Sequence, residues 1–172
     1  MAHTYTSNLL HCVFSTKERT ATIPAHLQEQ LCAYVFGIAK NIRIELLAIG
    51  GTQNHIHLLI TLPASRTLSE VIQTLKANSS RWVREHGVAF SWQEGYGAFS
   101  VSPSQVERVK DYILHQSEHH AKRNFDEEFL RCCVRLEWIM IRNMYWDSFL
   151  GAVPSGLGRD VLDSRPSTHV LG

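Results

Sequence analysis

Four residues in two short segments have the types and spacing of a metal site beside a nucleophile. His55 and His57 are separated by one residue, so on a strand both would point to one face, about 6–7 Å apart. Tyr112 and Gln116 are four residues apart, so on a helix they would lie one turn apart. If that helix edge met that strand face, two imidazoles and an amide oxygen could hold a divalent cation beside a phenol. Such a site would suit cleavage of a phosphodiester by a tyrosine nucleophile.

The chemistry explains why neutral ligands would be useful here. A phosphodiester resists attack because its oxygens are negative and its leaving group is poor. A bound cation would polarise a phosphate oxygen and favour the phenolate of a tyrosine, whose free pKa is about 10. Imidazole and amide ligands carry no charge, so the full positive field of the cation would act on the phosphate. We expect Mg²⁺ or Mn²⁺, although imidazole ligands also accept Zn²⁺, Co²⁺ and Ni²⁺.

Each candidate also has an ordinary structural explanation. Taken alone, His55 and His57 fit two half-buried strand histidines that are hydrogen-bonded to their neighbours. A tyrosine at a helix edge most commonly packs at an interface. The four-residue offset between Tyr112 and Gln116 favours the nucleophile over that alternative.

Composition places the chain among ordinary globular proteins. It has 172 residues, of which 44% are hydrophobic and 19% charged, which suits one domain with a substantial core. The net charge of +1 gives no general argument for nucleic-acid binding. The sequence has no run of membrane-spanning length and its N-terminus does not resemble a signal peptide, so we expect a cytoplasmic protein. Its cysteines are expected to be reduced and mostly buried; they are Cys12, Cys32, Cys132 and Cys133.

The hydrophobic pattern predicts an alternation of strands and helices. The predicted strands are 6–15, 42–49, 55–62 and 98–101; the helices are one that Pro24 opens, one over 67–85, and one that starts near Pro103 and carries Tyr112. This order predicts an α+β fold, the ferredoxin-like βαββαβ arrangement with a four-stranded antiparallel sheet. The first two helices would cover one face, and the last helix would bring Tyr112 to the histidines on the other.

Local signals refine the boundaries of these elements. Gly50-Gly51 predicts a turn after the second strand. Ser102, Pro103 and Gln105 have the pattern of a capping box with proline at the first helical position. Residues 125–134 suggest a further short helix. We expect the domain to span residues 1–147, and residues 148–172 to form a flexible tail.

Several longer phrases carry a resemblance to a known family. They are residues 54–59 (NHIHLL), residues 92–102 (WQEGYGAFSVS), Tyr112 and Gln116 followed by residues 118–120 (EHH), and the opening segments 4–7 and 13–17. With these phrases in this order, the chain resembles the single-tyrosine HUH-type transposases of bacterial insertion sequences, and their relatives associated with repetitive extragenic palindromes (REPs). The resemblance extends from residue 4 to residue 147.

The resemblance implies a specific activity. Members cut and rejoin single-stranded DNA at the ends of a mobile element, next to imperfect hairpins. It implies that His55, His57 and Gln116 bind the divalent metal, and that Tyr112 attacks the scissile phosphate and stays joined to the 5′ end. It also implies a homodimer in which the tyrosine helix completes its own or the partner's site, with residues 100–104 as the hinge. The alternatives are a domesticated relative that binds hairpin DNA without moving it, and a small hydrolase whose metal activates water.

Contacts with DNA stay open at this point. The basic candidates fit ordinary solvated faces equally well; they are Lys76, Arg81, Arg84, Lys110, Lys122 and Arg123. Trp92, Tyr96 and Phe99 could stack on unpaired bases, although core packing is the better explanation for Phe99. His119 and His120 are expected on an exposed helix surface.

Overall fold

The computed structural model describes residues 6–116 of the chain. Four strands form one antiparallel sheet with the order β2-β3-β1-β4. The elements, in chain order, are β1 (Leu9–Ser15), the short 3-10 helix η1 (Lys17–Arg19), α1 (Ala25–Asn41), β2 (Glu45–Gly51), β3 (His55–Thr61), α2 (Leu68–Glu85), β4 (Gly97–Ser100), the 3-10 turn η2 (Pro103–Gln105) and α3 (Val106–Leu114). The predicted ferredoxin-like α+β arrangement is therefore confirmed.

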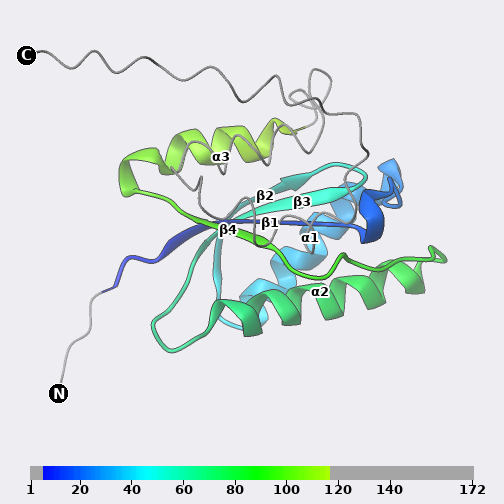
Figure 1. Cartoon of the computed structure of the whole chain (residues 1–172), viewed down its shortest axis with the longest axis horizontal. Helices are drawn as coiled ribbons and strands as arrows, with labels where there is room; N and C mark the ends of the chain where they lie inside the picture. Colours follow the sequence, from blue (N-terminus) through cyan, green and yellow to red (C-terminus); the bar gives the residue numbers. More distant parts are fainter. Residues whose placement is uncertain (1–5, 117–172) are drawn as a thin grey trace, which may run out of the picture.

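Two layers of helices lie on opposite faces of the sheet. Helices α1 and α2 pack together on one face, and α3 lies on the other (Figure 1). The main core lies between α1, α2 and the sheet, and includes Phe14, Leu31, Val35, Leu58 and Leu75. A smaller cluster of Ala48, Leu59 and Ile113 lies under α3. No helix among residues 6–116 is long and apolar enough to cross a membrane.

Helix α2 begins with a capping box that fixes its first turn. The Thr67 hydroxyl accepts a hydrogen bond from the Glu70 backbone N–H, and the Glu70 carboxylate accepts one from the Thr67 N–H. These bonds lower the pKa of the Glu70 carboxyl. The helix then places Val71, Ile72 and Leu75 in the main core.

An irregularity in β2 decides which of its residues face α3. Leu46 pairs with Ile60 but Ala48 pairs with Leu59, so one extra residue of β2 interrupts the register. Leu46 consequently joins Ile60 in the main core, whereas Ala48 packs with Leu59 on the α3 face. Since side chains alternate along a strand, Gly50 also faces α3.

The prediction of a turn at Gly50-Gly51 is wrong, because both glycines belong to β2 and pair with β3. The chain turns after them, where the Thr52 N–H donates to the His55 carbonyl at 2.9 Å. Gly50 is required by a close approach instead. A Cβ built on Gly50 would lie 2.1 Å from the Ile113 carbonyl oxygen in α3, which no packed structure tolerates.

The predicted capping box before the last helix is also wrong. The chain does enter a helix at Pro103, but the first turn is the 3-10 turn η2 and the α-helix begins at Val106. The Ser102 hydroxyl pairs with the Ser104 hydroxyl at 3.0 Å and caps no backbone N–H.

Several expectations fall outside the described residues. They concern the helix over 125–134, the boundary at 147, the tail 148–172, His119, His120, Lys122, Arg123, Cys132 and Cys133.

Replacing Gly50 tests whether the close approach of α3 matters. We expect Gly50→Ala to lower the free energy of unfolding by about 1–3 kcal/mol, because α3 has to move away from the new methyl group. Urea denaturation measures the loss, and hydrogen exchange at α3 amides shows where it falls. The control is Gly37→Ala in α1, where a Cβ would meet nothing within 4 Å. That change should stabilise the protein by roughly 0.5–1 kcal/mol.

Candidate active site between the sheet and helix α3

Both candidate histidines lie on β3 and face α3. Residues alternate along this strand, so Leu58 joins the main core while Leu59 packs under α3. His55 and His57 share the face of Leu59 and are buried, with ring centroids 4.9 Å apart and ring planes nearly perpendicular. The alternation inferred from the sequence therefore matches the structure of this strand.

Helix α3 holds Tyr112 over these histidines. The neighbouring Ile113 is fully buried against the sheet, which fixes the rotation of the helix. The Tyr112 ring then lies nearly perpendicular to two imidazoles, with its centroid 5.8 Å from that of His57 and 6.0 Å from that of His11. The strand histidine and the tyrosine are brought together within one chain.

Gln116 lies two residues beyond the end of α3 and follows the capping residue His115. Its side-chain amide donates to the Tyr112 carbonyl at 3.4 Å, as the four-residue offset allows. The Gln116 side chain is only 1% exposed. Its carbonyl oxygen Oε1 is buried and has no hydrogen-bond partner among the residues that the structure describes. A buried carbonyl without a partner is costly, and a metal ligand is one use for it.

Hydrogen bonds on the far side of the His55 ring determine which nitrogen carries its proton. His55 Nδ1 lies 2.7 Å from Asn54 Oδ1 and 3.0 Å from Thr52 Oγ1, and the Thr52 hydroxyl itself donates to Asn54 Oδ1 at 2.9 Å. Because Asn54 Oδ1 can only accept, the proton of neutral His55 belongs on Nδ1. Its Nε2 therefore presents a lone pair, as a metal ligand must.

The structure adds a third histidine that the sequence analysis did not single out. His11 lies on β1, is 6% exposed, and places Nε2 2.8 Å from Nδ1 of His57. The two rings are stacked with centroids 5.1 Å apart. The available signal was a histidine inside an otherwise apolar strand, but its meaning depends on β1 lying next to β3.

The donors available to a cation here are nitrogen and amide oxygen atoms. No group of three His, Cys, Asp or Glu side chains within residues 6–116 has metal-binding geometry. The two cysteines in that range are free thiols. Burial raises the pKa of Cys12 to about 12 and, with help from Glu29, that of Cys32 to about 11. Neither thiol is therefore a ready thiolate ligand.

Comparison with known proteins identifies the family. A model of the IS200-like transposases matches residues 4–116. The chain belongs to this transposase family. It is similar to a crystal structure of a candidate transposase from Deinococcus radiodurans R1, with 21% identity and a TM-score of 0.53 over 67% of this chain and 96% of that one. It is also similar to a REP-associated tyrosine transposase bound to a REP hairpin, with 15% identity and a TM-score of 0.54 over 70% and 73%.

No curated protein sequence is a significant match to the chain. At such low identity the two solved structures support the fold alone. Family membership confirms the resemblance found in the sequence, and it assigns the chain to transposases, enzymes that cleave and rejoin DNA.

One basic residue of this IS200-like transposase has a structural role. The Lys76 ammonium donates to the backbone carbonyls of Gln93, at 2.8 Å, and of Gly95, and it lies 5.1 Å from the ring centroid of Phe14. Burial lowers the pKa of Lys76 to about 8, although the carboxylate of Glu94 opposes the shift. Lys76 thus ties α2 to the loop before β4.

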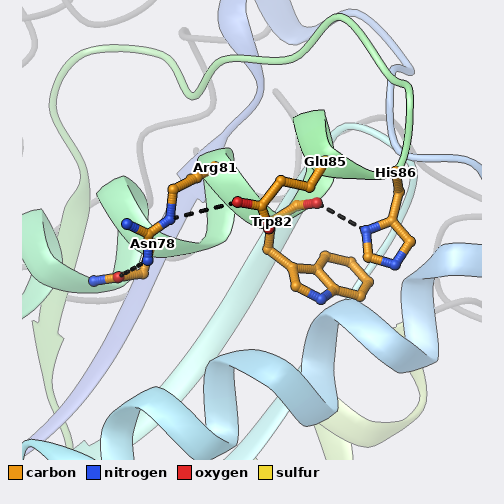
Figure 2. A network of polar contacts seen from close by, with 5 residues as sticks. All are labelled: Asn78, Arg81, Trp82, Glu85 and His86. Carbon is orange, nitrogen blue, oxygen red and sulfur yellow. Dashed lines mark hydrogen bonds and ion pairs between the residues drawn. The ribbon is translucent and has the colours of Figure 1, made fainter.

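The other described basic candidates form hydrogen bonds or ion pairs with residues three to six positions away in the sequence. Figure 2 shows Arg81 between Asn78, at 3.1 Å, and Glu85, at 3.9 Å. Arg84 donates to a backbone carbonyl of the loop that follows α2. Lys110 forms an ion pair within α3. Helix α2 lies across the sheet from α3 (Figure 1), so its arginines are not on the face that carries the tyrosine.

Two of the aromatic candidates serve in packing. Trp92 is 8% exposed and its indole N–H donates to the Ser79 hydroxyl at 2.9 Å. Phe99 is buried on the α3 face, with its ring centroid 6.2 Å from that of His11, which confirms the packing role expected for it. Tyr96 is partly buried at the edge of the main core.

Replacing Gln116 measures the cost of its buried carbonyl. We expect Gln116→Met to raise the free energy of unfolding of the metal-free protein by about 1 kcal/mol, because the apolar side chain fills similar space without an unbonded oxygen. Urea denaturation in the presence of a chelator provides the measurement. In the control Gln93→Met, the lost carbonyl accepts from the Glu18 N–H at 3.0 Å, so stability should fall. Equal losses in both variants would contradict the interpretation.

Proposed function

We propose that this transposase cuts and rejoins single-stranded DNA through a covalent bond between Tyr112 and the 5′ end of the cut strand. The observation that supports this most directly is the placement of Tyr112 beside His57, with ring centroids 5.8 Å apart in one chain. The tyrosine lies on α3 and the histidine on β3, so the fold places a candidate nucleophile next to a candidate metal ligand.

The proposed reaction exchanges one phosphorus–oxygen bond for another. The Tyr112 phenol gives its proton to water, its oxygen bonds to the scissile phosphorus, and the bond to the 3′ oxygen breaks. The 3′ oxygen takes up a proton and leaves as a hydroxyl. In rejoining, a 3′ hydroxyl attacks the phosphotyrosine and releases the phenol. The number of phosphorus–oxygen bonds stays constant, so the rejoining step requires no energy-rich cofactor.

We further propose that His55, His57 and Gln116 hold a divalent cation, Mg²⁺ or Mn²⁺. The residues fit such a group because Gln116 Oε1 is buried without a described partner, and because Nδ1 of each histidine faces another side chain. When bound, the cation would polarise a phosphate oxygen and stabilise the charge that develops as the bond breaks. The chain's own part is to hold the donors together and away from water.

The proposed substrate is single-stranded DNA next to a hairpin. This rests on the family and on the similar REP-associated tyrosine transposase, which is bound to a REP hairpin. We also propose a homodimer, with the segment before α3 as its hinge. In this structure Tyr112 lies beside histidines of its own chain.

Replacing the nucleophile tests the proposed reaction. We expect Tyr112→Phe to reduce cleavage on the order of 10³-fold or more, because the phenol oxygen that would bond to phosphorus is missing. The protein is incubated with Mn²⁺ and a pool of single-stranded oligonucleotides with varied hairpins, and mass spectrometry locates any nucleotide adduct. The control is Tyr34→Phe, since Tyr34 stacks on Trp82 with ring centroids 5.3 Å apart, away from α3.

The outcomes separate the alternatives. An adduct on Tyr112 that Tyr112→Phe abolishes supports the transposase mechanism. Hairpin binding without any adduct in the unmodified protein would favour a binding module. Turnover without a protein–DNA bond would favour a hydrolase that activates water.

Removing a ligand tests the metal proposal separately. We expect His57→Ala to weaken Mn²⁺ binding by more than about 100-fold, which exceeds the usual effect of a residue outside the ligand shell. Isothermal titration calorimetry measures the affinity. His86→Ala serves as the control, because His86 is exposed and its ring lies on Trp82 with centroids 4.0 Å apart. Equal Mn²⁺ affinity in both variants would refute the assignment of His57.

A further inference from the structure

The hydrogen bond between His11 and His57 joins two rings that can each either donate or accept. His11 Nε2 and His57 Nδ1 lie 2.8 Å apart, and both side chains are buried. A bond between two neutral imidazole nitrogens contains one proton, so one ring donates and the other accepts. The direction of this bond decides whether the other nitrogen of His57, Nε2, carries a proton or a lone pair.

We propose that His11 is a positioning residue that accepts this bond and thereby holds His57 with its proton on Nδ1. His57 Nε2 then presents its lone pair toward the cation site, and His11 carries its own proton on Nδ1. The inference rests on the proposed function, since it takes His57 as a ligand. It adds a residue of β1 to a site otherwise built from β3 and the end of α3.

The same arrangement occurs at the neighbouring histidine. Asn54 Oδ1 lies 2.7 Å from Nδ1 of His55, and it can only accept. Each candidate histidine ligand thus has a side-chain partner at Nδ1, an amide for His55 and an imidazole for His57. Such partners orient ligating histidines and set their tautomer. A carboxylate could do the same, but it would add negative charge close to the phosphate.

The position of His11 in the sheet makes this role specific. His11 pairs with Leu59 of β3 on one side and with Phe99 of β4 on the other, so its backbone is held in the middle of the sheet. Its ring stacks on His57 at an interplanar angle of 28° and meets the ring of Tyr112 at 78°. A side chain fixed in this way can determine the orientation of His57 without touching the substrate.

The direct test is to locate the protons in the metal-free protein. Long-range proton–nitrogen NMR spectra of protein labelled with ¹⁵N-histidine, recorded near neutral pH with a chelator, distinguish the two tautomers. We expect His57 and His11 to carry their protons on Nδ1. A proton on His57 Nε2 would overturn the proposal whether or not any variant folds.

Two variants of similar length test the acceptor. Gln at position 11 can place a carbonyl oxygen near the position of Nε2, whereas Met cannot accept a comparable bond. We expect His11→Gln to keep the tautomer of His57 and to bind Mn²⁺ within a few-fold of the unmodified protein, and His11→Met to lose the tautomer and to bind about 10–100-fold more weakly. Phe99→Leu, which changes only the packing beside His11, should keep the tautomer.

Identical tautomers and Mn²⁺ affinities in His11→Gln and His11→Met would refute the role of His11. The test of the proposed function is independent of this one, because adduct formation is measured on Tyr112 and not on His11. An adduct that requires Tyr112, together with a His57 tautomer insensitive to position 11, would leave the transposase mechanism standing and remove this inference alone.

Discussion

The site depends on how closely α3 approaches the sheet. Gly50 pairs with His57 across β2 and β3, and the Ile113 carbonyl of α3 occupies the space that a side chain at position 50 would need. This close contact allows the preceding residue, Tyr112, to reach the imidazoles of His57 and His11. Any larger residue at position 50 would separate the candidate nucleophile from the candidate ligands, even if every one of them stayed in the sequence.

Beneath α3, an amide and an imidazole hydrogen-bond to the two candidate histidine ligands. These groups belong to Asn54 and His11, and the Gln116 amide oxygen is buried just beyond the end of α3. Neutral partners matter when the substrate is a phosphate, since negative groups nearby would repel it and weaken the field of a cation. Burial strengthens each of these bonds and makes any misplaced proton costly.

The parts of this arrangement that depend on local spacing could be predicted from the sequence, and those that depend on pairing could not. Alternation along β3 correctly put His55 and His57 on one face, and the apolar order gave the fold. The sequence predicts a turn at Gly50, whereas the actual need for glycine there is the close approach of Ile113 in α3, a segment distant in sequence. The extra residue in β2 is defined only by its partner strand. The role of His11 could be recognised only from the pairing of β1 with β3, which brings it next to His57. The capping box expected at Ser102 does not form, because the Ser102 hydroxyl bonds to the Ser104 hydroxyl instead.

The two faces of the sheet are stabilised to different degrees, and this bears on how a tyrosine helix can move. Among residues 6–116, helices α1 and α2 share a core of many large apolar side chains, whereas α3 rests on a small cluster that includes Ala48, Leu59 and Ile113. Elements with few buried apolar contacts open at lower free energy than the core does. The buried Gln116 carbonyl lowers the stability of this contact further while no ligand bonds to it. Release of α3 would therefore cost less than unfolding the domain, which is the property that the proposed exchange of this helix between two subunits requires.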